Sequence, residues 1–176
     1  MRRSLIALSS ILSAVAFSLP AQKPPAGRSN QFFDSLLDHL AGDWHVTRKF
    51  ASDRMVQNTV HAEWVLNHQF LELHYLDVAR PSKYEAMVFI GYDTNQKRYI
   101  CHWIDVFGGE FLGLAEGNLD RGGHAIEFTF QYPDGKFTNR FTFDPESQIW
   151  TSLMRQEGKG EWKLFAEDKF TPIARK

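Results

Sequence analysis

The chain has 176 residues, of which 43% are hydrophobic and 14% aromatic, and its formal net charge at pH 7 is −1. This balance offers no basic excess to a phosphate backbone, so we expect no nucleic acid partner. Cys101 is the only cysteine, so no internal disulfide can form, and stability must come from the packing of 15 Phe, five Trp and five Tyr side chains.

Residues 1–22 have the layout of a secretory signal peptide. Two arginines begin the segment, residues 5–17 are mostly apolar, and small residues follow near its end. The apolar stretch is shorter than the roughly 20 residues that span a bilayer. We therefore expect cleavage, a periplasmic or secreted location, and no stable membrane insertion after processing. Residues 23–30, which are polar and contain two prolines, are predicted to be a flexible leader.

Residues 31–40 place apolar side chains at helical spacing with acids between them, which predicts a short amphipathic helix. Ser29 or Asn30 is expected to cap it. After Gly42 the apolar pattern changes to a period of two, and turn-forming residues separate ten strand candidates. These candidates cover residues 44–51, 56–66, 70–78, 84–92, 98–107, 111–119, 125–132, 137–143, 149–156 and 162–170.

Short turns between regular strands indicate an antiparallel meander. A flat meander of about ten strands would leave two exposed edges, and closure into an up-and-down barrel removes them. We therefore predict an all-β fold in which residues 31–172 form a single antiparallel barrel of about ten strands with a short N-terminal helix. A pair of glycines, Gly108 and Gly109, is predicted to form one of the hairpin turns.

The sequence LAGDW, residues 40–44, joins the predicted helix to the first strand. A short helix followed by Gly-x-Trp resembles the opening of the lipocalin and fatty-acid-binding barrels, which are called calycins. The resemblance implies that the helix closes one end of the barrel and that Trp44 packs beneath it. It also implies that a basic residue of a late strand stacks on this tryptophan, and Arg155 is the position that we assign to that role.

Three further segments resemble the DUF1579 family of calycin-like bacterial proteins. They are EWVLNHQFLEL, YEAMVFIGYDTNQKRYICHWIDVFGG and LAEGNLD. Gly91-Tyr92-Asp93 and Trp103-Ile104-Asp105 are the most specific pieces, and the resemblance covers most of residues 36–170. Asn67-His68 stands where the family usually has two glycines. The resemblance supports the fold and implies no activity.

The stretch YICHWIDVFGG, residues 99–109, places Cys101, His102 and Asp105 close together in sequence. Alternate residues of a strand point to opposite faces, so His102 faces away from both Cys101 and Asp105. A cysteine–histidine dyad needs hydrogen-bond contact, which adjacent strand residues cannot make. We therefore expect no catalytic dyad or metal site here, and we place Cys101, Trp103 and Asp105 on the inner face.

A barrel of this size can hold a ligand where its inner aromatic side chains line a cavity. Our leading hypothesis is a protein that binds a small, mostly apolar molecule, with Trp64, Tyr75, Trp103 and Asp105 as the ligand-binding residues. One alternative is a hydrolase or isomerase that uses Asp105, and another is an interaction domain with a filled core. No serine-hydrolase elbow or phosphate-binding loop occurs, so we assign no catalytic residue and no cofactor. The oligomeric state is left open.

A hairpin turn at Asn67-His68 would pair residues whose numbers sum to 135. Trp64 then lies opposite Leu71 on the inner face, as expected for a coherent apolar surface. We also expect Leu73, Trp103 and Phe128 to point inward. On the outer face the same register brings together two histidines and two glutamates, a set that contains enough ligands for zinc. These residues are His61, Glu63, Glu72 and His74. A solvated outer face is the favoured interpretation, and a metal site is the alternative.

Overall fold

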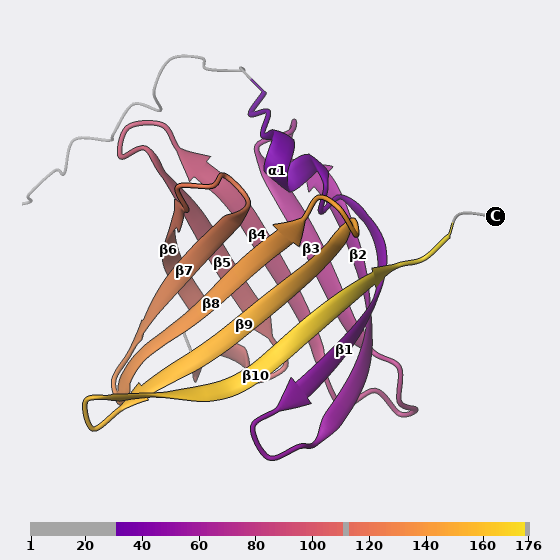
Figure 1. Ribbon diagram of the computed structural model, residues 1–176, viewed down its shortest axis with the longest axis vertical. Coiled ribbons are helices and arrows are strands. Elements are labelled where there is room, and N and C mark those ends of the chain that lie inside the picture. Colours follow the sequence, from indigo (N-terminus) through magenta and orange to yellow (C-terminus); the bar gives the residue numbers. More distant parts are fainter. Residues whose placement is uncertain (1–30, 111–112, 175–176) are drawn as a thin grey trace, which may run out of the picture.

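The computed structural model describes residues 31–110 and 113–174, and these residues form a β-barrel with one short α-helix (Figure 1). The helix α1 spans Ser35–Asp38, and a 3-10 helix, η1, spans Gly108–Glu110. The strands are β1 (Gly42–Phe50), β2 (Met55–Val65), β3 (Phe70–Asp77), β4 (Glu85–Asp93), β5 (Arg98–Asp105), β6 (Gly113–Leu119), β7 (Ala125–Tyr132), β8 (Gly135–Asp144), β9 (Ile149–Gly158) and β10 (Glu161–Pro172).

Every strand pairs antiparallel with its neighbours in the chain, and β1 pairs with β10 to close the barrel. This confirms the predicted all-β up-and-down barrel of ten strands. Closure leaves no strand of this sheet with an unpaired edge. Within the described part of the chain, no helix is long and apolar enough to cross a membrane.

Alternation of side chains gives each strand one buried face. Along β3, Leu71, Leu73 and Tyr75 are fully buried, whereas the residues between them are partly exposed. Phe128 is likewise buried, and Trp103 packs against the core from a half-buried position. The inward orientation predicted for these side chains is confirmed.

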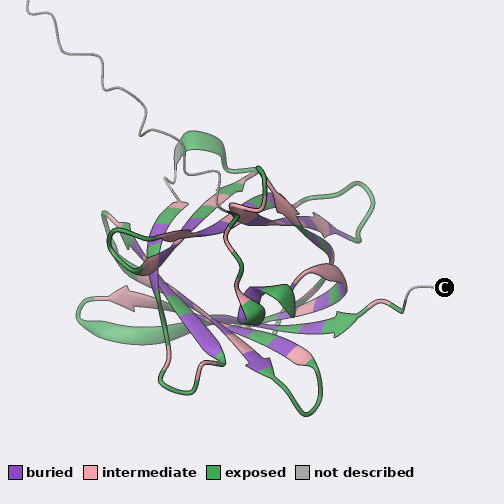
Figure 2. Cartoon of the chain, turned by 90° about the horizontal axis from the view of Figure 1, so that it is seen from above, coloured by how far each residue is buried: buried purple, intermediate pink, exposed green. Residues whose placement is uncertain are grey.

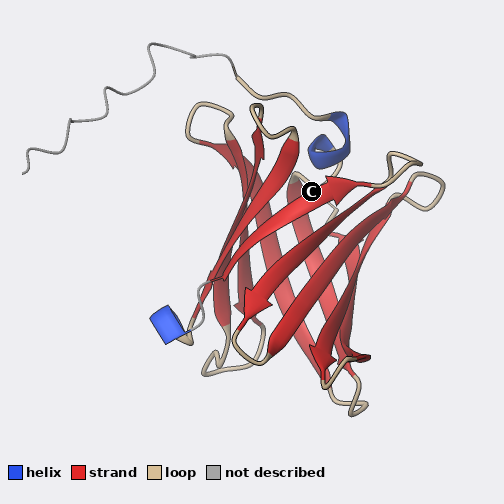
Figure 3. Ribbon diagram, turned by 90° about the vertical axis from the view of Figure 1, so that its left-hand side faces the viewer, coloured by secondary structure: helices blue, strands red, loops and turns tan. Residues whose placement is uncertain are grey.

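The helix α1 lies across part of one opening of the barrel, and η1 lies at the opposite end (Figures 2 and 3). Three tryptophan indoles hold the helix segment in place. The Nε1–H of Trp44 donates to the carbonyl of Leu40 at 2.8 Å, and that of Trp150 donates to the carbonyl of His39 at 3.1 Å. Trp64 donates to the carboxylate of Asp38 at 2.9 Å. The predicted packing of Trp44 beneath the helix is therefore confirmed.

Three predictions about the helix and Trp44 are wrong, namely the length of the helix, its cap and the partner of the tryptophan. The helix is one turn long and begins after Asp34, whose carboxylate accepts from the backbone N–H groups of Leu36 and Leu37 at 3.0 and 2.9 Å. Arg155 does not stack on Trp44. It is exposed, and it pairs with Leu164 near the far end of the barrel, whereas Trp44 packs edge-on against Phe170.

Two turns, one at each end of the barrel, also differ from the prediction. Gly108 and Gly109 form the 3-10 helix η1 instead of a two-residue hairpin turn. The turn between β2 and β3 contains four residues, because Leu66, Asn67 and His68 all adopt left-handed backbone angles, with φ of 50°, 56° and 61°. The predicted register is nevertheless correct, since Val65 pairs with Phe70 and Trp64 with Leu71.

The Gly-Tyr-Asp piece of the sequence joins three parts of the fold. A Cβ atom on Gly91 would lie 2.6 Å from the ring of Phe70, so a larger residue there would require that ring to move. Tyr92 stacks on Phe32 of the segment before α1, with ring centroids 5.4 Å apart. The carboxylate of Asp93 accepts from two backbone N–H groups of the β4–β5 turn. The motif therefore serves to build the barrel.

Candidate functional site

A cavity of about 920 Å³ occupies the half of the barrel remote from α1. Its lining residues lie at the strand ends that surround the opening near η1. Aromatic and thioether side chains form much of the wall, among them Phe50, Trp103, Phe130, Phe137, Met154 and Phe165. The opposite half is filled by buried apolar side chains that pack beneath the helix. The barrel is thus packed at one end and hollow at the other.

Phe165 reaches the mouth of this cavity because β10 is irregular. The register between β9 and β10 shifts between Leu164 and Ala166, which is the signature of a β-bulge. The Phe165 ring contacts Phe137 and Phe50 edge-on, with centroid distances of 5.3 and 5.7 Å. The bulge therefore contributes one aromatic wall of the mouth.

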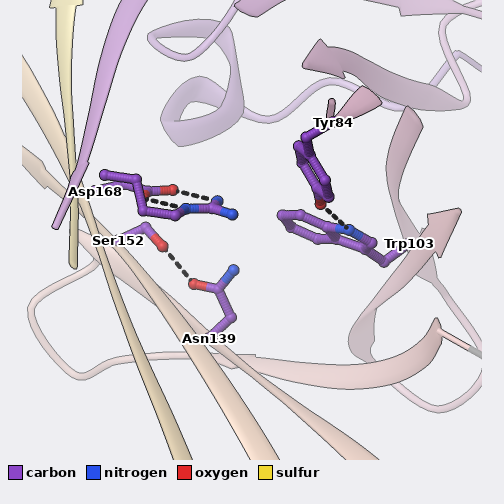
Figure 4. A network of polar contacts seen from close by, with 6 residues as sticks. Tyr84, Trp103, Asn139, Ser152 and Asp168 are labelled. Carbon is purple, nitrogen blue, oxygen red and sulfur yellow. Dashed lines mark hydrogen bonds and ion pairs between the residues drawn. The ribbon is translucent and has the colours of Figure 1, made fainter. Parts of the chain in front are cut away.

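Trp103 and Tyr84 form one side of the cavity (Figure 4). The indole Nε1–H of Trp103 donates to the hydroxyl oxygen of Tyr84 at 3.1 Å. Burial raises the pKa of Tyr84, so its hydroxyl keeps its proton. A Cβ atom on Gly113, which pairs with Trp103, would lie 2.1 Å from the Trp103 carbonyl oxygen. Glycine at that position lets β6 approach the strand that carries the tryptophan.

The inner end of the cavity is polar. Arg48 donates from Nε and Nη2 to the two carboxylate oxygens of Asp168, both at 2.7 Å. Arg48 and Asp168 are 7% and 2% exposed, so this ion pair is buried. Desolvation lowers the pKa of Arg48, but the hydrogen bond and the charge of Asp168 raise it by more, so the pKa of Arg48 lies above its ordinary value. The guanidinium also lies 5.8 Å from the ring centroid of Tyr84.

Further polar groups surround this ion pair. Ser152 donates to the side-chain oxygen of Asn139 at 2.6 Å, and the Asn139 nitrogen points away from Ser152, towards the side of Trp103 and Tyr84 (Figure 4). The side-chain oxygen of Asn58 and the hydroxyl of Tyr75 are buried without a hydrogen-bond partner among the described residues. We call Arg48, Asn58, Tyr75, Asn139, Ser152 and Asp168 the polar layer.

Comparison with known protein families shows to which family this barrel belongs. A family model described as "Protein of unknown function (DUF1579)" matches residues 33–172, which include α1 and all ten strands. The chain belongs to the DUF1579 family. The match confirms the resemblance of the sequence segments, and its description assigns no activity. No curated protein matches the chain.

The DUF1579 barrel brings two of the four predicted ligand-binding residues to the cavity, namely Trp103 and Asp105. Tyr75 lies behind Trp103, with ring centroids 5.4 Å apart, and is fully buried. Trp64 lies at the other end, where it stacks on His68 and bonds to the helix. The structure therefore separates Trp64 from the other three residues.

Asp105 sits at the rim of the cavity, near the end of β5. Its carboxylate accepts from the backbone N–H of Phe107 at 3.0 Å, and the residue is partly exposed. This bond to a backbone amide gives Asp105 a structural role at the end of β5. Cys101 is buried deeper on the same strand, where burial raises the pKa of its thiol, while His102 is exposed on the outer face as expected.

The outer-face histidines of the DUF1579 barrel bind separate carboxylates. His61 lies 2.6 Å from Asp43, and His74 lies 2.7 Å from Glu85. The predicted pairing of His61 with His74 is present. Even so, no group of three His, Cys, Asp or Glu side chains within residues 31–110 and 113–174 is arranged to hold a metal ion.

Apart from Tyr75, sequence reasoning missed the polar layer, although one signal was available. Alternation from Trp44 through Val46 places Arg48 on the inner face of β1, and the same rule places Asp168 beside Phe170 on β10. A charged residue in an inward position of each strand indicates a buried pair. That the two strands are neighbours follows only from closure of the barrel.

Proposed function

We propose that this protein binds a small, mostly apolar molecule in the open half of its barrel. The single observation that carries the proposal is the cavity of about 920 Å³, which opens at one end and has aromatic walls around a small set of polar groups. Cavities of about 300–1,000 Å³ with this composition are typical of ligand sites. The hypothesis of a filled core lacks this support.

The test is a titration with N-phenyl-1-naphthylamine, a neutral apolar dye that becomes fluorescent in an apolar site. Wild type should bind it saturably, and Trp103→Ala should weaken binding by about tenfold because it removes an aromatic wall. Trp162→Ala is the matched control, since Trp162 is 46% exposed and does not line the cavity. Absence of saturable binding, or equal losses in both variants, would contradict the proposal.

The enzyme alternative depends on Asp105, which lies at the rim. Asp105→Asn keeps the acceptor for the Phe107 backbone, so the fold should remain intact. If Asp105 contacts the ligand, dye affinity should fall while the melting temperature stays the same. Unchanged affinity with lost stability would assign Asp105 a structural role.

Export to the periplasm or the medium is part of this proposal, and it is supported by residues 1–22, which lie outside the described residues. The mature protein should begin between residues 19 and 24. N-terminal sequencing of the exported protein would measure this, and retention of Met1 would exclude cleavage.

A further inference from the structure

The polar layer at the inner end of the cavity restricts the chemistry of the ligand that can bind there. An apolar cavity for an apolar molecule does not need a buried ion pair, and burial of such a pair brings little net stability. Yet Arg48 and Asn139 both line the cavity while being only 7% and 2% exposed. Polar groups held in this way at the inner end of a ligand cavity fix the orientation of the molecule that enters.

At the inner end of the cavity, the groups that remain free to bond are mainly hydrogen-bond donors. Arg48 uses Nε and Nη2 for Asp168, and its Nη1 takes no part in that pair. Asn139 uses its oxygen for Ser152, which leaves its nitrogen pointing inward (Figure 4). Tyr84 accepts from Trp103 and keeps its own proton to donate. Arg48 belongs to β1 and Asn139 to β8, and Tyr84 is the residue that precedes β4.

The remaining polar groups at the inner end do not alter the balance. Asp77 lines the cavity and is 6% exposed, but its carboxylate oxygens already accept from the backbone N–H groups of Ala79 and Lys83 at 2.9 and 3.3 Å. The oxygen of Asn58 and the hydroxyl of Tyr75 are covered by surrounding side chains, so they do not face the open space. The Asp168 carboxylate is engaged by both nitrogens of Arg48, and its exposure is 2%. A ligand that reaches the inner end therefore meets donors before it meets acceptors.

We infer that the ligand carries an uncharged hydrogen-bond acceptor, such as a ketone or ester carbonyl, on an apolar body, and binds with this oxygen against Arg48, Tyr84 and Asn139. The inference rests on the proposed function. A carboxylate fits less well, because Asp168 already balances the charge of Arg48 and a second buried anion would have no cation of its own. A cation has only donors to offer to a surface of donors.

The experiment measures displacement of N-phenyl-1-naphthylamine by four molecules of similar length: 2-undecanone, undecane, decanoate and decylamine. At pH 7.5 the ketone should displace the dye at roughly five- to tenfold lower concentration than the other three, since an unmatched buried donor costs about one hydrogen bond. Equal potency of ketone and alkane, or higher potency of decanoate or decylamine, would overturn the inference. Failure of the dye to bind would instead refute the proposed function.

Two variants locate the effect. Asn139→Leu should remove most of the preference for the ketone over undecane while dye binding persists. Thr138→Val is the matched control, because it makes a polar-to-apolar change at the neighbouring residue of β8, which does not line the cavity, so the preference should be retained. Thermal unfolding confirms that both variants are folded. If Asn139→Leu is unfolded, Tyr84→Phe replaces it, with loss of preference expected. A folded Asn139→Leu or Tyr84→Phe variant that keeps the full preference would overturn the assignment.

Discussion

At the residue scale, loss of one partner of the Arg48–Asp168 ion pair should destabilise the protein more than replacement of both partners. Each is buried, and each satisfies the other through two hydrogen bonds of 2.7 Å. Asp168→Ala leaves an unpaired buried guanidinium and should lower the free energy of unfolding by about 3–5 kcal/mol. The double variant Arg48→Met/Asp168→Leu replaces the pair with apolar groups. Its free energy of unfolding should be within about 1 kcal/mol of the wild-type value or higher than it.

Urea denaturation of the three proteins measures these differences. Lys49→Ala serves as a control, because the Lys49–Asp53 pair is exposed and its loss should change stability by well under about 1 kcal/mol. If the double variant is as unstable as Asp168→Ala, the ion pair is required for the fold and the argument from ligand recognition loses its basis.

Two tyrosines provide a matched comparison of hydroxyl groups. The Tyr75 hydroxyl is buried without a partner among the described residues, whereas the Tyr99 hydroxyl donates to the carboxylate of Asp34. Tyr75→Phe removes an unsatisfied group and should leave stability unchanged or raise it by about 1 kcal/mol. Tyr99→Phe removes a charge-assisted hydrogen bond and should cost about 1.5–3 kcal/mol. Thermal unfolding of both variants would test this, and equal losses would contradict the assigned bonding.

His61 should make stability depend weakly on pH. Its hydrogen bond to Asp43 raises its pKa above the ordinary value of 6.5, so its contribution is complete below that pH and is lost as the pH rises through the raised pKa. The imidazole is about half exposed, so the effect should stay below about 0.5 kcal/mol. Urea denaturation between pH 5 and pH 8.5 should show this slope in wild type and a smaller slope in His61→Ala.

Zinc provides the complementary test of the outer face. Because His61 and His74 contact different carboxylates, added zinc should shift the melting temperature of wild type and of His61→Ala/His74→Ala equally. A rise in wild type alone would restore the metal hypothesis.

The helix segment and three tryptophans form a unit at the element scale. A helix of one turn has little stability of its own, and its position depends on the indoles that bond to Asp38, His39 and Leu40. Trp44→Ala removes a buried ring together with one of these bonds and should cost about 3–5 kcal/mol. Denaturant unfolding measures the loss, and a change as small as that of the exposed Trp162→Ala would contradict the role of Trp44.

The whole barrel combines a packed half with an open half. Local opening is easiest where few apolar contacts hold the backbone. We therefore expect amide hydrogen exchange to be slowest around Val46 and Leu73, beneath the helix, and faster at the cavity end of the same strands, near Phe50 and Asp77. Bound N-phenyl-1-naphthylamine should slow exchange at the cavity end most. Uniform protection along each strand would contradict this division.

Alternation along each strand was enough to predict the barrel, because a period of two is a local property of neighbouring residues. It placed Leu71, Leu73 and Phe128 inside and His102 outside, and the pairing of Trp64 with Leu71 followed from one turn position. Local signals were weaker at helix ends. Asp34, Ser29 and Asn30 are all good caps by residue type, and only the contacts of Asp34 with α1 and Tyr99 select it.

The sequence by itself thus determined the fold class, the register of β2 with β3 and the inner faces of strands such as β3 and β5. Tertiary structure alone decided which end of the barrel is hollow, and it separated Trp64 from Trp103 and joined Arg48 to Asp168. The physical reason is distance along the chain. Faces are set by adjacent residues, whereas a cavity depends on side chains that meet across the barrel from strands up to 120 residues apart, as Arg48 and Asp168 are.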